Sequence, residues 1–336
     1  MRYHQVLIRP EVEVRSYPRI HISLLEMNGG LGRVNGGLGF GIGSPVNRIR
    51  IRSARRSNII CNLKMDVEAI EYVRSIVNRV TNTKGLPECE VEVLQALPSH
   101  QGLGCFTSMG LAVVEGIFVH NGVKYTNDEV VALAHRGGTS GVGISTYFEG
   151  RLAVDLGHET KLGDVENFTP SSFAWKRGRA LALSSIPMPL WPVLLLVPRT
   201  RRISENEEKA FFRKVCPLPV DEVARTIRVC FFGILPTVMT QNYSRFCEML
   251  KLLRNTFWKR SEIALYSRDT LDIMERAEEF GADAASMSSM GPLVYCFARK
   301  SRRKAIMDRL KKEFDLSMTG IAYPRNRGRY VRIGSR

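Results

Sequence analysis

The chain has 336 residues, of which 44% are hydrophobic and 24% charged, a composition typical of a globular protein with one large or two medium-sized domains. Lysine and arginine outnumber aspartate and glutamate by 49 to 33. The resulting net charge of +16 favours anionic ligands without distinguishing nucleic acid from a small phosphorylated substrate. No run approaches the roughly 18 apolar residues of a membrane span, so no membrane partner is expected.

The N-terminus carries charge throughout and has no signal-peptide pattern, which favours a cytoplasmic location. The seven cysteines are scattered without a CxxC pair, and we expect them to be reduced and mostly buried. A structural zinc site is not expected, because the histidines are equally dispersed.

The first predicted elements are strands. Residues 3–25 alternate apolar and polar side chains and predict a strand interrupted near Pro18. Residues 28–45 contain eight glycines among aliphatic and aromatic residues, which favours a closely packed strand over a linker. Alternation over 46–53 predicts a half-exposed strand, and residues 64–80 have the apolar spacing of an amphipathic helix.

A second group of elements follows residue 88. Residues 89–98 alternate as a strand, and 107–120 predict a buried helix. Residues 126–136 predict another helix, with Thr126 or Asn127 as its cap. The glycine-rich stretch 137–158 is predicted to form a turn that leads into a strand hairpin.

The character of the chain changes from about Ile186. A buried strand at 192–198 precedes a helix that begins with Ser204 and Glu207 in capping-box spacing. Further helices are predicted at 221–235, 241–256, 270–280 and 302–314, and a short strand at 292–298. The order of elements predicts an α+β chain of two lobes, with domains 1–185 and 186–336.

Much of the positive charge lies in local clusters. These clusters occupy 47–58, 198–202, 299–304 and 324–336, and no nucleic-acid-binding module accompanies them. A solvated basic surface is the ordinary interpretation of each, and a nucleic-acid contact is the alternative.

The stretch Leu97–Ile117 has the layout of a strand end, a glycine turn and a helix start. Gly102, Leu103 and Gly104 form the turn, and the following helix N-terminus would offer unpaired N–H groups and a favourable dipole to an anion. The alternative is that the glycines serve only a tight turn. The pattern is neither GxxxxGK[ST] nor GxGxxG, which excludes a P-loop.

Three further segments favour anion binding. Arg19, His21 and Asn35 lie within or beside the first glycine-rich element. A second potential anion nest, with an arginine followed by glycines and hydroxyl residues, comprises Arg136, Gly137, Gly138, Thr139, Ser140 and Gly141. Ser288 and Ser289 precede a glycine and a strand in the second lobe.

In this order the motifs resemble the GHMP family of small-molecule kinases, in which a loop of the form PxxxGLGSSA cradles nucleotide phosphates. The segments "RIHISLLEMNG", "HQGLGCFTSMGLA", "RGGTSGVGISTYFEG", "VDLGH" and "SSMGPLVY" together look like one branch, the β-ribofuranosylaminobenzene 5′-phosphate synthases of methanopterin biosynthesis. The resemblance covers roughly residues 15–300. It implies a two-lobed fold with a ribosomal-protein-like N-terminal α/β domain and a ferredoxin-like C-terminal α+β domain.

Two departures from the kinases bear on function. Cys105 and Phe106 stand where the paired serines of the kinase loop would be. Gly143 stands where many kinases of the family have a catalytic aspartate. Positioning and electrostatics supply most phosphoryl-transfer catalysis, so a kinase without these groups is conceivable. A relative that kept the anion cradle and lost phosphoryl transfer is the stronger expectation.

The resemblance implies that phosphoribosyl pyrophosphate condenses with 4-aminobenzoate, or with 4-hydroxybenzoate, to a C-riboside 5′-phosphate with release of CO₂ and pyrophosphate. Such a site needs cationic or N–H groups at the leaving pyrophosphate, with Mg²⁺ as its counter-ion, and a dry aromatic wall. ATP is not expected. A homodimer is the default expectation.

Roles follow from the resemblance for individual residues, and an ordinary structural role is the alternative for each. His21 and His158 are expected to act as acid or base or to hold substrate oxygens, and Asp155 to bind Mg²⁺ or ribose hydroxyls. Arg19 is expected at a carboxylate or phosphate, and Phe106 at the apolar wall. Residues expected to bind the phosphates or to close the site are Asn35, Gly102, Leu103, Gly104, Thr107, Ser108, Arg136, Gly137, Gly138, Thr139, Ser140, Gly141, Ser288 and Ser289.

Two other classes stay open. A GHMP-type ATP-dependent kinase would bind ATP, and a basic nucleic-acid-binding protein would show a steep dependence of affinity on salt. The second alternative leaves the paired glycine nests unexplained, so we rank it last.

Overall fold

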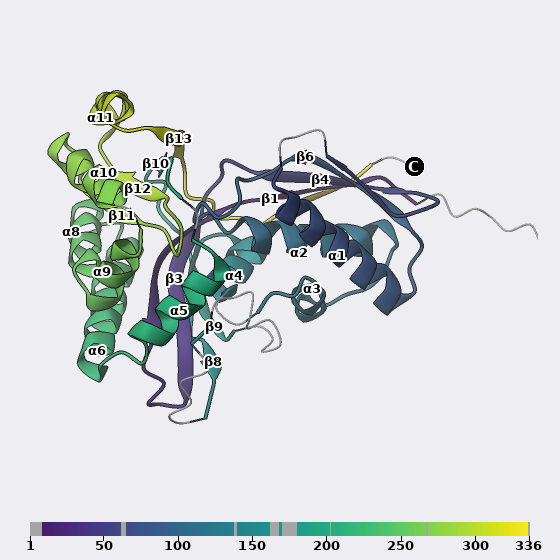
Figure 1. The fold of residues 1–336 in the computed structure, drawn as a ribbon, viewed down its shortest axis with the longest axis horizontal. Helices are drawn as coiled ribbons and strands as arrows, with labels where there is room; N and C mark the ends of the chain where they lie inside the picture. Colours follow the sequence, from purple (N-terminus) through teal and green to yellow (C-terminus); the bar gives the residue numbers. More distant parts are fainter. Residues whose placement is uncertain are drawn as a thin grey trace, which may run out of the picture.

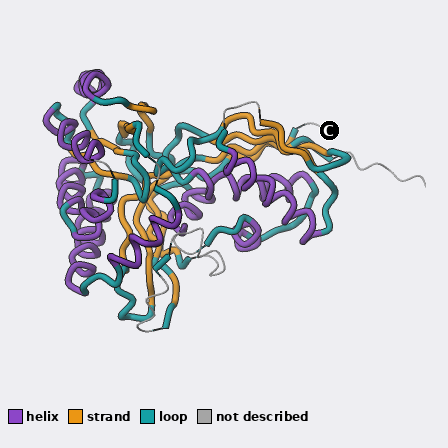
Figure 2. The backbone as a smooth tube through the Cα atoms, in the orientation of Figure 1, coloured by secondary structure: helices purple, strands orange, loops and turns teal. Residues whose placement is uncertain are grey.

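A computed structural model describes residues 9–61, 65–137, 140–161, 168–169, 180–201, 203–266 and 268–334. Two lobes meet along a central sheet, whose long strand β3 (Arg33–Gly41) runs between them in Figure 1. Strands pass through both lobes, and the helices cover one side of the first lobe's sheet and the outer side of the second lobe (Figure 2). The mixed α+β, two-lobed fold expected from the sequence is confirmed.

The first lobe is built on a five-stranded sheet with the order β14-β1-β4-β6-β5. Its strands are β1 (Val12–Ser16), β4 (Asn47–Ser53), β5 (Asn58–Cys61), β6 (Cys89–Gln95) and β14 (Tyr330–Ile333). Helices α1 (Val67–Lys84) and α2 (Cys105–His120) pack on one face of this sheet, and α3 (Asn127–Leu133) lies beside them. The predicted capping residue of α3 is confirmed, because Thr126 and Glu129 form a capping box.

The central sheet has the order β2-β3-β7-β9 and is antiparallel throughout. It consists of β2 (Arg19–Glu26), β3, β7 (Leu152–Asp155) and β9 (Ala182–Ile186), and the short β8 (His158–Glu159) also pairs with β3. The glycine-rich segment is a strand, as predicted. Gly37 and Gly39 let the strand pack closely against the helix Gly141–Glu149, because a Cβ at Gly39 would lie 2.7 Å from Val142 of that helix.

The second lobe has a four-stranded sheet with the order β11-β12-β10-β13 and a layer of helices. Its strands are β10 (Val193–Pro198), β11 (Ala284–Met287), β12 (Val294–Phe297) and β13 (Leu316–Ala322). Its helices are α5 (Glu205–Val215), α6 (Val220–Val229), α7 (Leu235–Met239), α8 (Tyr243–Arg254), α9 (Phe257–Ala264), α10 (Arg268–Glu279) and α11 (Lys300–Glu313). A single turn of π-helix, Cys230–Ile234, joins α6 to α7. The capping box predicted for α5 is confirmed.

The prediction for residues 137–158 was wrong in part. A helix, α4 (Gly141–Glu149), precedes β7 where a hairpin was expected. The low helix propensity of glycine led to the prediction of a turn here. Tertiary packing nevertheless requires glycine at these positions of the helix. A Cβ at Gly141 would overlap the Asp155 carboxylate, and one at Gly143 would lie 3.2 Å from the Thr107 methyl group.

The chain ends in the first lobe. Strand β14 pairs with β1 in antiparallel register, so residues 330–333 belong to the first lobe. The sequence had placed them in the second domain, 186–336. The return is anchored by Arg329, whose guanidinium donates to the buried Glu115 carboxylate at 2.9 Å. The Tyr125 and Tyr147 hydroxyls donate to the same carboxylate. No signal in the sequence pairs residues so far apart along the chain.

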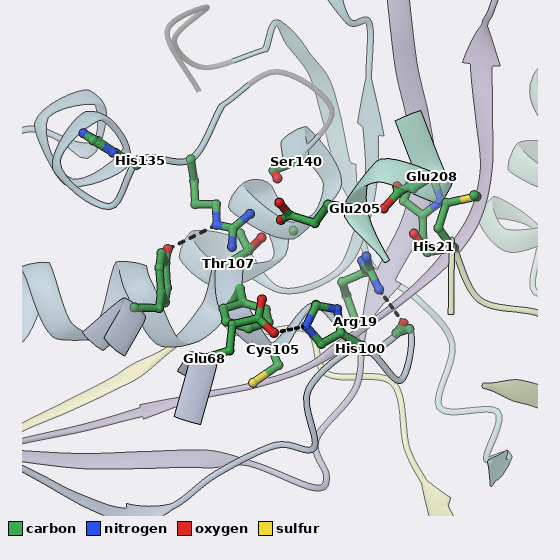
Figure 3. Close-up of a pocket in the computed structure, with 18 of the residues that line it drawn as sticks. Arg19, His21, Glu68, His100, Cys105, Thr107, His135, Ser140, Glu205 and Glu208 are labelled. Atoms are coloured by element: carbon green, nitrogen blue, oxygen red, sulfur yellow. Dashed lines mark hydrogen bonds and ion pairs between the residues drawn. The ribbon is translucent and has the colours of Figure 1, made fainter. Parts of the chain in front are cut away.

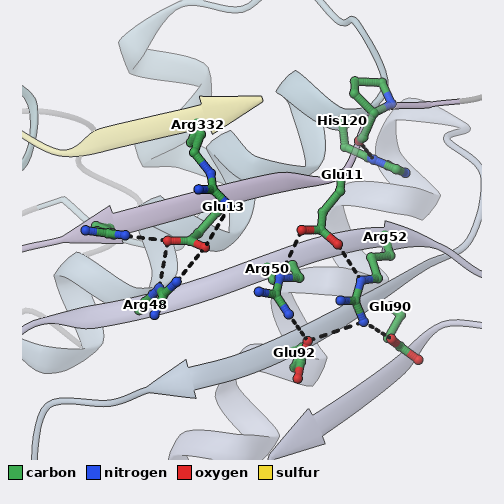
Figure 4. Close-up of polar contacts among 11 residues, drawn as sticks. Glu11, Glu13, Arg48, Arg50, Arg52, Glu90, Glu92, His120 and Arg332 are labelled. Atoms are coloured by element: carbon green, nitrogen blue, oxygen red, sulfur yellow. Dashed lines mark hydrogen bonds and ion pairs between the residues drawn. The ribbon is translucent and has the colours of Figure 1, made fainter. Parts of the chain in front are cut away.

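The basic cluster at 47–58 forms cross-strand ion pairs on the outer face of the first sheet (Figure 4). Arg48, Arg50 and Arg52 alternate with buried side chains along β4 and face glutamates of β1, of β6 and of the position just before β1. The pairs are Arg48–Glu13 at 2.7 Å, Arg50–Glu11 at 3.1 Å, Arg50–Glu92 at 3.0 Å and Arg52–Glu11 at 2.7 Å. Pairing of this kind neutralises much of the cluster's charge.

The described helices include none that is both long enough and apolar enough to cross a membrane.

Replacing Arg329 with methionine should lower the free energy of unfolding by about 3 kcal/mol, because the Glu115 carboxylate would remain buried without its cation. Urea denaturation measures the effect. The control is Arg332→Met on the same strand, whose guanidinium lies 3.8 Å from Glu13 and is 52% exposed. This control should cost less than about 1 kcal/mol. Equal losses in the two variants would contradict the anchoring role of Arg329.

Candidate functional site

A cavity of about 530 Å³ lies between the lobes (Figure 3). Its walls come from β2, from α1 and α2, from the residues after α3, and from α5 and α9 of the second lobe. Nine of the residues expected at the site line it: Arg19, His21, Gly102, Gly104, Phe106, Thr107, Arg136, Ser140 and Ser289. The sequence motifs therefore converge on one space, although they are far apart along the chain.

The N-terminus of α2 opens into this cavity. Gly104 is its N-cap residue with φ +74°, and the first turn of the helix contains no acidic residue. Arg19 lies across the turn, since its Nη1 donates to the Gly102 carbonyl at 2.6 Å and a Cβ on Gly104 would be 3.4 Å from its Cζ. Burial lowers the pKa of Arg19 to about 10, which leaves the guanidinium charged at neutral pH. A helix N-terminus beside a buried cation suits an anionic ligand.

The backbone of the glycine turn contacts the second lobe directly. The Ser288 hydroxyl donates to the Gly102 carbonyl at 2.8 Å and accepts from the His21 N–H at 3.0 Å. A Cβ on Gly102 would lie 2.5 Å from the Ser288 carbonyl oxygen, and one on Gly291 would overlap the Gly102 backbone. Ser288 is fully buried and ties the lobes together at the turn, whereas Ser289 lines the cavity.

His21 is a neutral imidazole in the cavity wall. Burial lowers its pKa well below the usual range, and the nearby charges of Arg19 and Lys259 lower it further. Its side chain is 4% exposed, and its Nδ1 has no hydrogen-bond partner among the residues that the structure describes. A buried ring nitrogen of this kind is available to a ligand oxygen.

Cys105 and Phe106 have different environments. The Cys105 thiol is buried and donates to the Leu97 carbonyl at 3.2 Å, and burial raises its pKa to about 12. It is therefore an inert structural thiol. Phe106 is half-buried and lines the cavity, as the apolar-wall hypothesis required.

The N-terminus of α4 already faces a carboxylate of the chain. Asp155 is buried, its Oδ1 accepts from the Gly157 N–H at 2.7 Å, and its Oδ2 abuts Gly141. Burial raises its pKa to about 7 against the opposing effects of that N–H and of Arg33. An external phosphate would compete with this carboxylate for the same helix N-terminus. Arg136 and Ser140 line the cavity, but Gly137, Gly141 and Asp155 do not. Gly138 and Thr139 lie outside the described residues.

Other expected residues lie in the surrounding structure. Leu103 belongs to the hydrophobic core, and the Ser108 hydroxyl accepts from Asn47 at 2.9 Å instead of facing the cavity. His158 is buried on β8. Asn35 has φ +70° and is fully buried, and neither of its amide atoms has a partner among the described residues. None of these four lines the cavity.

The sequence reasoning missed the acidic side of the cavity. Glu205 and Glu208 project from the first turns of α5, and Glu262 of α9 forms a buried ion pair with Lys259 at 2.6 Å. Burial raises the pKa of Glu208 to about 8, and repulsion by Glu205 and Glu262 adds to the effect. Three glutamates between 205 and 208 in a basic chain were the available signal, but helix capping alone accounts for acidic residues there. Within the described residues no group of three His, Cys, Asp or Glu side chains is arranged to hold a metal ion.

Comparison with solved structures identifies the fold. The chain superposes on homoserine kinase from Cytophaga hutchinsonii with a TM-score of 0.65 at 12% identity, covering 99% of this chain and 100% of that one. It also superposes on mevalonate kinase from L. major with a TM-score of 0.67 at 12% identity, covering 94% and 96%. The fold is that of the GHMP kinases.

The sequence is similar to different proteins within this fold. It is 29% identical to the β-ribofuranosylphenol 5′-phosphate synthase of Methanocaldococcus jannaschii, over 90% of this chain and 93% of that protein. It is 27% identical to the Archaeoglobus fulgidus protein of the same name, over 96% and 100%. No family model matches the chain. The predicted resemblance to a synthase branch of the GHMP fold is confirmed, as is the prediction of an enzyme.

The structure shows what Gly143 and Phe106, two residues that depart from the kinase pattern, contact in this chain. Gly143 lets α4 approach α2, because any side chain at this position would crowd Thr107. Phe106 places an aromatic ring in the cavity wall, beside Tyr72 and His100. The cavity thus combines an anion-binding helix terminus with an aromatic wall.

Replacing Gly102 with alanine should lower the free energy of unfolding by about 3 kcal/mol, because a positive φ and a collision with the Ser288 carbonyl add together. The matched control is Gly122→Ala, which has φ +66° but no atom within 4 Å of the added Cβ. This control should cost about 1 kcal/mol. Both values come from urea denaturation, and similar losses would argue against a tight joint between the lobes.

Replacing Asp155 with asparagine should make the protein more stable than the native chain at pH 8, by on the order of 3 kcal/mol, and much less so at pH 5. The pKa of Asp155 is raised from 3.8 to about 7 by folding. Its contribution to stability is therefore present below pH 3.8 and is lost as the pH rises through 7. The measurement is the difference in unfolding free energy between the two proteins at each pH. A difference that does not change with pH would show that Asp155 is ionised throughout.

Proposed function

We propose that the chain condenses phosphoribosyl pyrophosphate with 4-hydroxybenzoate to β-ribofuranosylphenol 5′-phosphate, releasing CO₂ and pyrophosphate. The names of the similar proteins support a phenol product and hence a hydroxyl group on the acceptor, in place of the amino group expected first from the motifs. The assignment to methanopterin biosynthesis is part of this proposal.

The reaction balances without an oxidant or reductant. The bond between the anomeric carbon and pyrophosphate breaks, and the pyrophosphate leaves with its electron pair. The ring carbon that bears the carboxylate forms the new C–C bond. The bond to the carboxylate then breaks, and its electron pair restores the aromatic ring as CO₂ departs.

The observation that carries the proposal is that one cavity combines the α2 N-terminus, Arg19 and the ring of Phe106. The first two suit the leaving pyrophosphate, because a buried guanidinium and aligned N–H groups stabilise developing negative charge. The third suits an aromatic acceptor in a site with little water, which favours loss of CO₂.

Three of the lining residues have a direct role in the proposal. Arg19, the first N–H groups of α2 and the Thr107 hydroxyl bind the pyrophosphate. His21 hydrogen-bonds a substrate oxygen as a neutral imidazole, because its lowered pKa makes it a poor acid at neutral pH. Asp155 and His158 lie outside the cavity lining, and no step is assigned to them.

Glu205 and Glu208 are the residues that would hold Mg²⁺, which when bound supplies charge neutralisation to the pyrophosphate. Magnesium in phosphate sites uses one or two carboxylates and completes its coordination with substrate oxygens and water. Repulsion between these glutamates contributes to the raised pKa of Glu208, and a cation would relieve it. They fit the ion better than Asp155, whose carboxylate is engaged by Gly157.

The test is to incubate the purified chain with Mg²⁺, phosphoribosyl pyrophosphate and carboxyl-labelled 4-hydroxybenzoate. Labelled CO₂ and pyrophosphate should appear in equal amounts, faster than with 4-aminobenzoate. Arg19→Gln should reduce turnover at least about 100-fold, because a pyrophosphate partner is lost. Arg228→Gln, which changes an exposed arginine of α6, is the matched control and should leave turnover unchanged.

Two outcomes would favour the alternatives. Absence of labelled CO₂ above background together with ATP-dependent phosphorylation of a small alcohol would favour a kinase. Tight, salt-sensitive binding of nucleic acid without turnover would favour the third class. The ion pairs of Arg48, Arg50 and Arg52 argue against that class, since they remove one candidate binding surface.

A further inference from the structure

Three aromatic side chains meet in the part of the cavity formed by α1 and the start of α2. The rings of Tyr72 and Phe106 lie 5.3 Å apart, edge to face at 78°. The His100 ring lies 5.1 Å from Phe106 at 58°. All three residues line the cavity. Rings in these orientations form an aromatic wall against which a further planar ring can pack.

Arg136 is fixed over this wall. Its Cζ lies 5.2 Å from the centre of the Tyr72 ring and 5.7 Å from that of Phe106. Its Nε donates to the Tyr72 hydroxyl at 3.1 Å, and that hydroxyl donates to the Ala134 carbonyl at 2.8 Å. Arg136 is 8% exposed. A guanidinium held in one plane beside aromatic rings matches a planar carboxylate joined to a ring.

The charges of the two ends differ. Glu68 and Glu71 of α1 line the cavity near the aromatic wall, and Glu68 pairs with His100 at 2.9 Å. Carboxylates repel a multiply charged pyrophosphate more strongly than a singly charged acid, and they accept a hydrogen bond from a phenol hydroxyl. The end near Arg19 has the α2 N-terminus and a buried cation, and the nearby carboxylate of Glu262 is paired with Lys259.

We propose that Tyr72, Phe106 and Arg136 form the subsite for the aromatic acid, and that Arg19 and the α2 N-terminus bind only the pyrophosphate end of the other substrate. This inference rests on the proposed function and deepens it. It moves Arg136 from the predicted phosphate nest to the carboxylate of the acceptor. Phe106 and Thr107 are neighbours in the first turn of α2, so the two subsites adjoin where the new bond must form.

The test is calorimetric binding of 4-hydroxybenzoate and, separately, of magnesium pyrophosphate, with each titration repeated in the presence of the other ligand. Phe106→Ser, which places a small hydroxyl residue on α2, should weaken 4-hydroxybenzoate binding about tenfold and change pyrophosphate binding less than about threefold. Phe106→Tyr should retain binding. Phe232→Ser, at a phenylalanine that is 83% exposed on the second lobe, is the matched control and should change neither.

Arg136→Lys should also weaken 4-hydroxybenzoate binding about tenfold, since an ammonium cannot form the paired contact of a guanidinium. Melting temperatures show whether each variant is folded. Equal loss of both ligands in folded Phe106→Ser, unchanged binding of the acid, or no binding by the native chain under any of these conditions would overturn the subsite. If the native chain binds the acid in a Phe106-dependent manner but releases no CO₂, the subsite stands and the proposed reaction falls.

Discussion

The contact between the glycine turn and the second lobe determines the rest of the site. Gly102 meets Ser288 and Gly291 through backbone atoms, and the Ser288 hydroxyl also holds the backbone of His21. This junction fixes the α2 N-terminus against β2, and with it the position of Arg19. Because neither glycine carries a Cβ, the lobes approach more closely than a Cβ at Gly102 or Gly291 would permit. The cavity lies between the two lobes, beside this contact.

Electrostatics divide the cavity into two chemical environments. A buried arginine and a helix N-terminus provide positive potential at one end, and aromatic rings with a stacked guanidinium occupy the other. The acidic residues of α5 line the same cavity from the second lobe. The overall charge of +16 has little part in this, since the arginines of β4 are paired with glutamates on an outer face. Local geometry, not net charge, makes the site suitable for a phosphorylated substrate.

The predictions from sequence succeeded where a local pattern was enough and failed where packing reversed a propensity. Alternation identified β4 and β6, and the capping boxes of α3 and α5 were recognised. Helix α4 was missed, because its glycines are required by contacts with Asp155 and Thr107 that lie far away in the sequence. The motifs led to Arg19, His21 and the glycine turn, but Tyr72, Glu68 and Glu208 entered the site only because α1 and α5 pack beside it.

The sequence by itself determined most helices and strands, the glycine turn, and the absence of the paired serines of the kinase loop. Each of these features depends on residues that are adjacent in the chain. Tertiary structure alone decided which of these groups face the cavity. It turned Ser108 away, bonded the Cys105 thiol to the Leu97 carbonyl, placed Asp155 against a helix that was expected to bind phosphate, and brought Phe106 to Tyr72 and Arg136. The reason is physical: the direction of a side chain depends on the neighbours that exclude it or bind it, and most of those neighbours are distant in the chain.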